Sequence, residues 1–169
     1  LAFRWALDKP WDYMARVNAS CYVHKRRLRE YVQDLPEKGL IRGVIADPTE
    51  HCQVKRPWMW GGGQFILSRD VVEAIVANAG RIKHWLMEDT ALGEIAQDCG
   101  FTLDGGGKVC SINLQPDGSW IVMGYGGGPS FTMSEPGDIP DHHFIRVKYD
   151  PDRSVDGKIM QLLKTHLKP

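Results

Sequence analysis

The hydrophobic pattern of this chain changes its period several times, and that alternation limits the fold more than any other feature. Apolar residues recur at helical spacing over 71–79 and again over 91–99, and each stretch ends at a glycine, Gly80 or Gly100. A short apolar run at 64–67 precedes the first stretch, which is typical of a strand that leads into a helix. Helices that alternate with strands bury their apolar faces on a sheet, so we expect an α/β fold.

The same arguments predict the remaining elements. In the first half we expect the end of a helix over 1–7, a strand over 13–17, a helix over 23–35, a strand over 40–45, a loop over 50–60, a helix over 68–80 capped by Ser68, and a helix over 89–99. In the second half, turn residues at 115–119 between two apolar runs predict a β-hairpin over 108–125. After it we expect a loop over 126–140, a strand over 143–149 and a helix over 156–167. The predicted fold class is α/β, with a mixed sheet flanked by helices, a C-terminal β-hairpin and a terminal helix, in a single domain over 1–169.

Charge and composition exclude several classes of partner. The chain has 21 basic and 21 acidic residues, so it has no global field that would attract nucleic acid or an anionic membrane, and we expect no nucleic-acid partner. A phosphate-bearing ligand must therefore be held by local groups. No apolar run approaches the roughly 20 residues of a spanning helix, so we expect no membrane span in this chain. The four cysteines include no CxxC pair, which argues against a zinc site, and we favour free thiols.

Two stretches carry candidate chemistry. Gly61, Gly62 and Gly63 let a ligand approach the backbone closely and expose N–H groups. Glu88 and Asp89 stand at a predicted helix start, where the helix dipole stabilises an ionised carboxylate. An ionised, positioned carboxylate can deprotonate an attacking hydroxyl. On physical grounds alone, a helix cap at Asp89 and a glycine bulge form the simpler interpretation.

These two stretches also carry a resemblance to a known family. They read Gly61-Gly62-Gly63-Gln64-Phe65-Ile66-Leu67-Ser68 and Glu88-Asp89-Thr90-Ala91-Leu92-Gly93. Together they resemble the fringe and β-galactosyltransferase group of glycosyltransferases, which shows Gly-Gly-Gly-Tyr-Val-Leu-Ser and then Glu-Asp-Val…Gly. Upstream, Arg16-x-Asn18-x-Ser20 is similar to glycosyltransferases of large algal viruses that decorate capsid glycans. The resemblance covers about Trp11 to Gly100.

The resemblance implies a GT-A fold and assigns roles to particular residues. Asp89 becomes the expected catalytic base, with Glu88 beside it, and Arg16, Asn18 and Ser20 the expected donor-binding residues. That group has an Asp-x-Asp metal motif where this chain has Asn18-Ala19-Ser20, and neutral oxygens bind a hard cation more weakly than paired carboxylates do. An equally open interpretation makes Asn18 and Ser20 turn residues at a strand exit. The resemblance also implies that a nucleotide-binding N-terminal part is absent from this chain, which would be the C-terminal, acceptor-side part.

A third cluster lies near the end of the chain. In many GT-A enzymes a late His completes the metal site and basic residues meet the diphosphate, which here makes His142 or His143 a candidate metal ligand and Arg146 and Lys148 candidate diphosphate ligands. Neighbouring residues of a strand point to opposite faces, so only one His can point into a site. A solvated polar strand edge is an equal alternative. We expect a divalent metal, manganese, bound weakly and together with the nucleotide.

The resemblance therefore implies a nucleotide-sugar-dependent glycosyltransferase of the hexosyltransferase type. Its expected donor is a UDP-sugar, and its expected acceptor is a hydroxyl of a glycan or glycoprotein, as in glycan biosynthesis and viral capsid glycosylation. Trp58 and Trp60 are expected to stack on the acceptor sugar beside Gly61, Gly62 and Gly63, although both could be core anchors. The expected location is the cytoplasm, that of the host if the protein is viral. The alternative function is a non-catalytic carbohydrate-binding or interaction module derived from such an enzyme.

Overall fold

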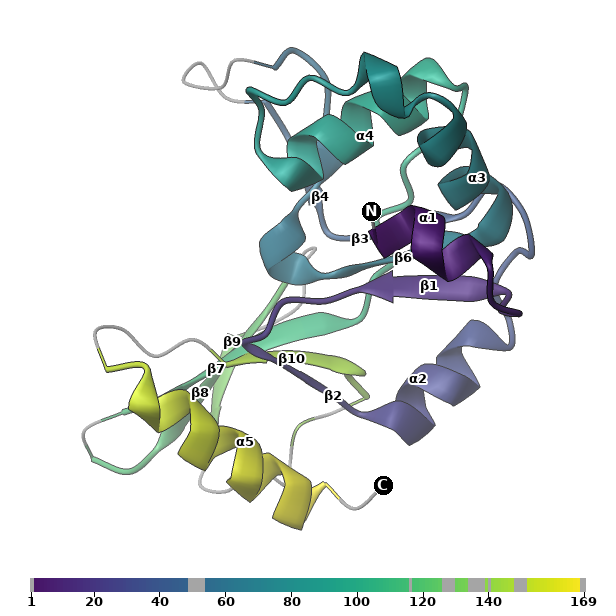
Figure 1. The fold of residues 1–169 in the computed structure, drawn as a ribbon. Helices are drawn as coiled ribbons and strands as arrows, with labels where there is room; N and C mark the ends of the chain where they lie inside the picture. Colours follow the sequence, from purple (N-terminus) through teal and green to yellow (C-terminus); the bar gives the residue numbers. More distant parts are fainter. Residues whose placement is uncertain are drawn as a thin grey trace. The chain divides into compact units, whose positions relative to one another are not determined.

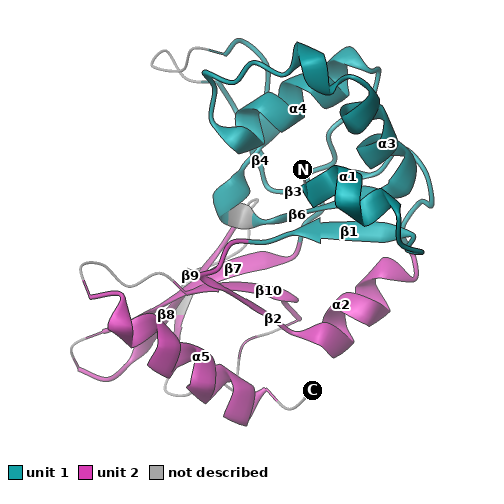
Figure 2. Ribbon diagram, viewed as in Figure 1, with its two compact units in different colours: residues 1–17, 35–107 teal, residues 18–34, 108–169 magenta. Residues whose placement is uncertain are grey.

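The described part of the chain forms two compact units, each with its own sheet and helices (Figures 1 and 2). The computed structural model describes residues 2–48, 54–115, 117–125, 130–133, 139, 141–147 and 152–167. Unit 1 comprises Leu1–Val17 and Leu35–Gly107, and unit 2 comprises Asn18–Asp34 and Lys108–Pro169. The expected α/β class, with mixed sheets flanked by helices, is confirmed. That the two units make up a single domain stays a prediction.

Unit 1 is built on a small antiparallel sheet with its most buried strand in the middle. The sheet has the order β1 (Tyr13–Arg16), β6 (Phe65–Ser68), β3 (Ile41–Gly43). All four residues of β6 are buried, as expected of a central strand. A second, two-stranded sheet pairs β4 (Ile45–Ala46) with β5 (Trp58–Met59), and a 3-10 turn at Gly61–Gly63 leads from β5 to β6.

Three helices of unit 1 provide the apolar faces that cover its sheet. They are α1 (Ala2–Leu7), α3 (Arg69–Ala77) and α4 (Glu88–Asp98) (Figure 1). A short 3-10 turn at Ala79–Arg81 follows α3. The stripes predicted from the periodicity are those that pack, since the core joins Val71, Val72, Ile75, Ile95 and Ala96 to Phe65, Leu67, Ile41 and Met59.

Ser68 was expected to cap α3, and its position is confirmed but a capping hydrogen bond is not. Ser68 occupies the N-cap position, but its side chain makes no capping hydrogen bond to the helix backbone. Its hydroxyl instead donates to Asp70 Oδ1 at 2.6 Å and accepts from the Leu40 N–H at 2.9 Å. The hydroxyl is completely buried next to β6, and the N–H of Leu40 is the donor within its reach there. Helix α4 is followed by Gly100, which has φ +91°, the left-handed conformation that glycine favours after a helix.

Unit 2 contains a mixed sheet with the order β2 (Cys21–Val23), β10 (Phe144–Val147), β7 (Val109–Leu114), β8 (Trp120–Gly124), β9 (Ser130–Met133). Strand β10 runs parallel to β7, and the other pairs are antiparallel. Helix α5 (Ser154–His166) covers one face, with Ile159 and Leu163 packed on Ile145 and Val122. Helix α2 (Lys25–Val32) begins after His24, whose Nδ1 accepts a hydrogen bond from the Arg27 N–H at 3.3 Å.

Several short strands differ from the expectation. Strand β2 occupies part of the stretch that was expected to begin a helix at Val23, and the strand predicted over 40–45 is interrupted at Val44. Strands β5 and β9 lie in stretches that were predicted to be loops. A strand of two to four residues has too few side chains to show a period, and it forms because a partner strand pairs with it. Among the described residues, no helix combines the length and apolar character needed to cross a membrane.

Candidate functional site

Asp89 connects the start of α4 to the glycine segment. Its Oδ1 accepts a hydrogen bond from the Thr90 N–H at 2.8 Å, and its Oδ2 accepts one from the Gly61 N–H at 2.7 Å. The side chain is half-buried in the first turn of the helix, where the helix dipole also favours a negative charge. Two backbone donors therefore fix the position of the carboxylate.

Arg16, at the end of β1, brings the second carboxylate into the same group. Its Nη2 donates to Glu88 Oε2 at 2.6 Å, its Nε lies 3.5 Å from Glu88 Oε1, and its Nη1 donates to the Gly61 carbonyl at 2.8 Å. The planar guanidinium can contact a carboxylate and a carbonyl at once because its donors form a rigid fork. We call Arg16, Gly61, Glu88 and Asp89 the carboxylate cluster; it joins β1, the 3-10 turn and α4 within unit 1.

The ion pair itself contributes little to stability. The Arg16 side chain is 18% exposed and that of Glu88 is 60% exposed, and ion pairs so open to water stabilise by about 1 kcal/mol at most. The pair instead orients the two groups. In the hydrogen bonds described above, the Arg16 side chain contacts Glu88 and the Gly61 carbonyl, whereas Asp89 accepts from backbone N–H groups.

Glycine is required where the cluster is most crowded. A Cβ on Gly61 would lie 2.9 Å from Asp89 Oδ2, 3.0 Å from Asp89 Cβ and 3.2 Å from Arg16 Nη1. A Cβ on Gly93, one turn further along α4, would lie 2.9 Å from the Cβ of Trp58. The first glycine of the Gly61–Gly63 segment and the glycine that follows Glu88-Asp89 thus serve the same purpose, which is close packing of α4 on the β5–Gly63 stretch.

Gln64 is a strained residue that sequence reasoning missed. It has φ +59° and ψ 159°, a conformation that costs a non-glycine residue on the order of 1–3 kcal/mol, and it is completely buried. Its Nε2 donates to the Gly62 carbonyl at 2.9 Å, so the side chain closes the turn that its own backbone makes. No pattern of residue types indicates this strain, because three glycines precede it and any of them could have carried the unusual φ.

The two predicted tryptophan platforms differ in their surroundings. Trp58 is buried, at 6% exposure, and its Nε1 has no hydrogen-bond partner among the described residues. Its ring is therefore a core anchor between β5 and α4, and the expectation that it stacks on a sugar does not fit this position. Trp60 is half-buried, and its N–H donates to the Val44 carbonyl at 2.8 Å, so Trp60 stays the candidate platform.

The expected donor-binding residues are distributed over both units. Arg16 belongs to unit 1, whereas Asn18 and Ser20 belong to unit 2, where their carbonyls accept from the N–H groups of Cys21 at 3.0 Å and Val147 at 2.7 Å. These backbone bonds make Asn18 and Ser20 turn and edge residues before β2, which agrees with the structural alternative for them. Arg146 is half-buried on β10, between Cys21 and Ser111 on the neighbouring strands. Lys148 lies outside the described residues.

The histidine pair separates into a buried and a half-buried member. His143 is 1% exposed and packs against Tyr31, with ring centroids 4.3 Å apart, and against Phe144 at 4.6 Å. Burial lowers the pKa of His143 to about 4, and neither ring nitrogen has a hydrogen-bond partner among the described residues. His142 is half-buried, and its carbonyl accepts from Arg27 Nη1 at 3.3 Å. Of the two candidate metal ligands, only His142 reaches the surface of its unit.

Side chains that could bind a metal ion, thiols included, do not form a cluster of three or more in the described part of the chain. No group of three or more His, Cys, Asp or Glu that could hold a metal ion lies among those residues. Cys21, Cys99 and Cys110 are free, as expected, while Cys52 lies outside the described residues. Burial raises the pKa of Cys21 and of Cys110 to about 12, so neither thiol is a nucleophile near neutral pH.

No protein-family model matches the chain, and a search of curated proteins finds no significant match.

Proposed function

We propose that the chain is the acceptor-side, catalytic part of a nucleotide-sugar-dependent glycosyltransferase with Asp89 as its base. The observation that carries the proposal is the fixed carboxylate of Asp89, which two backbone N–H groups hold at a helix start. A carboxylate offers about four lone-pair sites, and these two bonds occupy one site on each oxygen. Oδ1 also accepts from the Thr90 hydroxyl at 3.5 Å, so Oδ2 is the oxygen that keeps a site for the proton of an incoming hydroxyl.

On the acceptor side, the proposed sugar transfer needs only a carboxylate such as that of Asp89. The acceptor hydroxyl oxygen forms a bond to the anomeric carbon while Asp89 takes its proton. The bond between that carbon and the diphosphate breaks, and its electron pair leaves with the diphosphate. Glu88 keeps Arg16 in position, and Arg16 in turn holds the Gly61 carbonyl, so the donor N–H of Gly61 stays directed at Asp89.

The donor and its ligands are those that the resemblance in the sequence implies. A UDP-sugar is the favoured donor, and Asn18, Ser20, Arg146 and Lys148 are its candidate ligands. A divalent ion such as manganese would neutralise charge on the diphosphate, with His142 as the protein ligand and diphosphate oxygens as most of the others. His143 is not a candidate for this role, because its ring nitrogens are buried in unit 2.

One observation favours a second candidate, a non-catalytic carbohydrate-binding module. Both oxygens of Asp89 already bond to the backbone, so the carboxylate could serve only to attach α4 to the glycine segment. In that case Trp60 would bind a glycan without transfer. The two candidates differ in whether a nucleotide sugar is bound and consumed.

Replacement of Asp89 by asparagine distinguishes the two candidates. We expect Asp89→Asn to lower transfer from a UDP-sugar to a glycan on the order of a hundredfold or more, as for loss of a general base, with donor binding unchanged within a few-fold. Asp98→Asn is the matched control, since Asp98 ends the same helix and pairs with Arg56 at 2.6 Å. Transfer by Asp89→Asn within a few-fold of the parent would remove Asp89 from the mechanism. The binding module would be favoured if glycans raise the melting temperature, UDP- and GDP-sugars do not, and no nucleotide sugar is consumed.

A further inference from the structure

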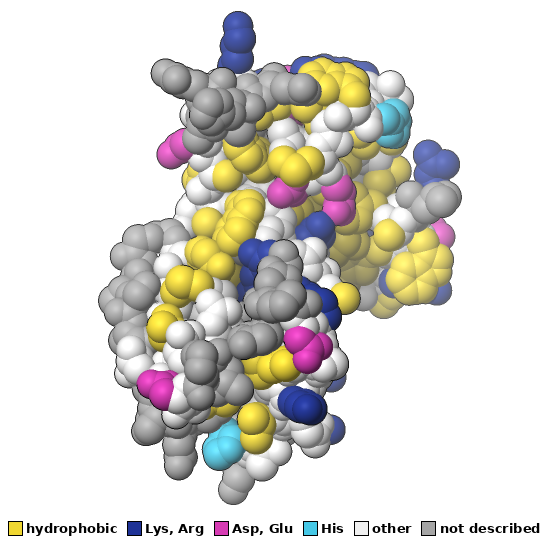
Figure 3. Space-filling view, turned by 90° about the vertical axis from the view of Figure 1, so that its left-hand side faces the viewer, with side chains coloured by type: hydrophobic (Ala, Val, Ile, Leu, Met, Phe, Trp, Pro, Cys, Tyr) yellow, Lys and Arg dark blue, Asp and Glu magenta, His cyan; other side chains and the backbone are white. Residues whose placement is uncertain are grey.

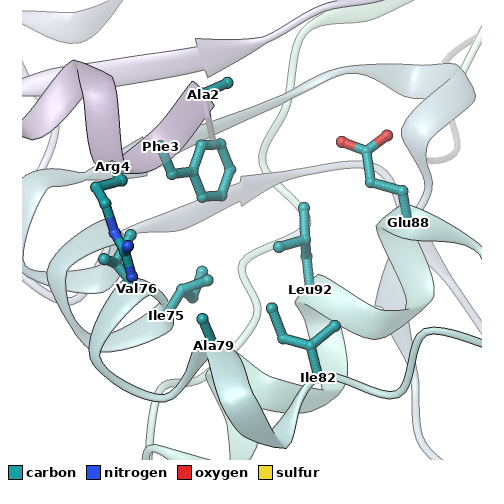
Figure 4. A pocket seen from close by; sticks show the side chains of 9 residues that line it. All are labelled: Ala2, Phe3, Arg4, Ile75, Val76, Ala79, Ile82, Glu88 and Leu92. Carbon is teal, nitrogen blue, oxygen red and sulfur yellow. The ribbon is translucent and has the colours of Figure 1, made fainter.

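A pocket of about 370 Å³ lies in unit 1, next to the carboxylate cluster, with which it shares Glu88 (Figure 4). It lies between α1, α3, the 3-10 turn that follows α3, and α4. Its wall is apolar, formed by Phe3, Ile75, Val76, Ala79, Ile82 and Leu92. Ala2 and two charged side chains, Arg4 and Glu88, complete the lining, and Figure 4 shows apolar side chains between the two charged groups. The volume falls within the range of about 300–1,000 Å³ that is usual for small-molecule sites.

The apolar wall is open to water. Phe3, Val76, Ile82 and Leu92 are only half-buried, although each packs against the core of unit 1. Helix α1 thus covers α3 and α4 incompletely and leaves a hollow between them. A ligand with an apolar body would remove this surface from water, which is favourable in proportion to the apolar area covered. On the face that Figure 3 shows, hydrophobic, basic and acidic side chains are mixed.

The two charged groups at the pocket are not equivalent. The carboxylate of Glu88 is already paired with Arg16 at 2.6 Å. Arg4, in contrast, is exposed and makes no hydrogen bond or ion pair with another described residue. The pocket therefore has one charge that its surroundings do not compensate, and that charge is positive. A guanidinium in this state is suited to a carboxylate or a phosphate, which it can bind through two parallel N–H donors.

We propose that this pocket binds an anionic single-chain amphiphile. The aliphatic chain occupies the hollow between Phe3, Val76 and Leu92, and the phosphate or carboxylate head lies on the guanidinium of Arg4. The Glu88 end stays free of the head, because a second negative charge there would be repelled. Binding at this pocket does not depend on the proposed transferase activity, although Glu88 lies at both sites and places the ligand next to the carboxylate cluster.

Calorimetry on the whole chain with four probes tests the ligand class. The probes are decyl phosphate, decanoate, decanol and inorganic phosphate, each below the concentration at which it aggregates. We expect saturable binding of one equivalent of decyl phosphate or decanoate, about fivefold weaker binding of decanol and no saturable binding of inorganic phosphate. The tighter of the two anionic probes identifies the head group. Absence of saturable binding by both anionic probes would overturn the proposal.

Two variants test the location. Arg4→Gln should weaken the tighter anionic probe about fivefold and leave decanol unchanged, because the exposed charge contributes only to the head group. Ala79→Leu should fill the hollow and weaken all three aliphatic probes, while its circular dichroism spectrum verifies the fold. The control is Arg29→Gln, which removes an exposed arginine of α2, outside the pocket, and should change nothing. Unchanged affinities in both Arg4→Gln and Ala79→Leu would show that the ligand binds elsewhere.

Discussion

Replacement of Gly61 by alanine tests whether close packing at the carboxylate cluster is as tight as the structure indicates. The added methyl group would lie 2.9 Å from Asp89 Oδ2, which requires a shift, and 3.0 Å from Asp89 Cβ, which is tighter than most Cβ contacts. The shift would fall on the hydrogen bond between the Gly61 N–H and Asp89, which is 2.7 Å long. Crowding of this kind costs about 1–3 kcal/mol, and loss of a hydrogen bond to a charged group costs about 1.5–3 kcal/mol. Because Asp89 is only half-buried, we expect a combined loss of about 2–3 kcal/mol.

Urea denaturation followed by tryptophan fluorescence measures this loss. Five of the six tryptophans lie in unit 1, so the signal reports mainly on that unit (Trp5, Trp11, Trp58, Trp60 and Trp85). The control is Gly80→Ala, where an added Cβ meets nothing within 4 Å. That variant should be neutral, or stabilising by about 0.4–1 kcal/mol, because alanine restricts the unfolded chain.

A double-mutant cycle isolates the contact itself. In an Asp89→Ala background the carboxylate oxygen is gone, so Gly61→Ala should cost at least about 1 kcal/mol less than it does in the parent. Transfer activity should fall with Gly61→Ala as well, because Asp89 would lose its position. If Gly61→Ala costs no more than Gly80→Ala, or if its cost is the same in both backgrounds, the close contact at Asp89 does not exist in solution.

Three further predictions concern unit 2. Gly157 lies in α5 with nothing within 4 Å of its potential Cβ, so Gly157→Ala should raise the free energy of unfolding by about 0.5–1 kcal/mol in thermal or urea denaturation; a loss would indicate that this part of α5 is not helical in solution. Burial lowers the pKa of His143 from 6.5 to about 4, so on acidification the unfolded chain takes up the proton first. The free energy of unfolding should therefore not depend on this group above about pH 6.5, and should fall between about pH 6.5 and pH 4. The variant His143→Phe should remove this dependence, and the control His84→Gln should keep it. In calorimetry, manganese should bind appreciably only with UDP present, and His142→Ala should weaken it; tight binding without UDP would reveal a preformed carboxylate site, and full activity in a strong chelator would exclude a metal requirement.

The amino-acid sequence by itself determined the elements that are long enough to show a period. Helices α3, α4 and α5 and the hairpin of β7 and β8 lie where periodicity and turn residues predicted them, within a few residues at each end. Their apolar stripes are about three turns long or alternate over five or six residues, and neighbouring residues alone generate such patterns. The glycine segment at 61–63 and the later Glu88-Asp89 are also visible in the sequence, and together they indicate Asp89 as a candidate base.

Only the tertiary structure decided which side chains meet. Arg16 pairs with Glu88 across 72 residues, and Gly61 donates to Asp89 across 28, so neither contact leaves a local pattern in the chain. The same holds for burial: Trp58 and His143 are residue types that often bind ligands at a surface, but both are buried in their units. Short strands such as β2, β5 and β9 exist because a partner strand satisfies their backbone groups. A contact free energy depends on distance in space, and a sequence pattern records only distance along the chain.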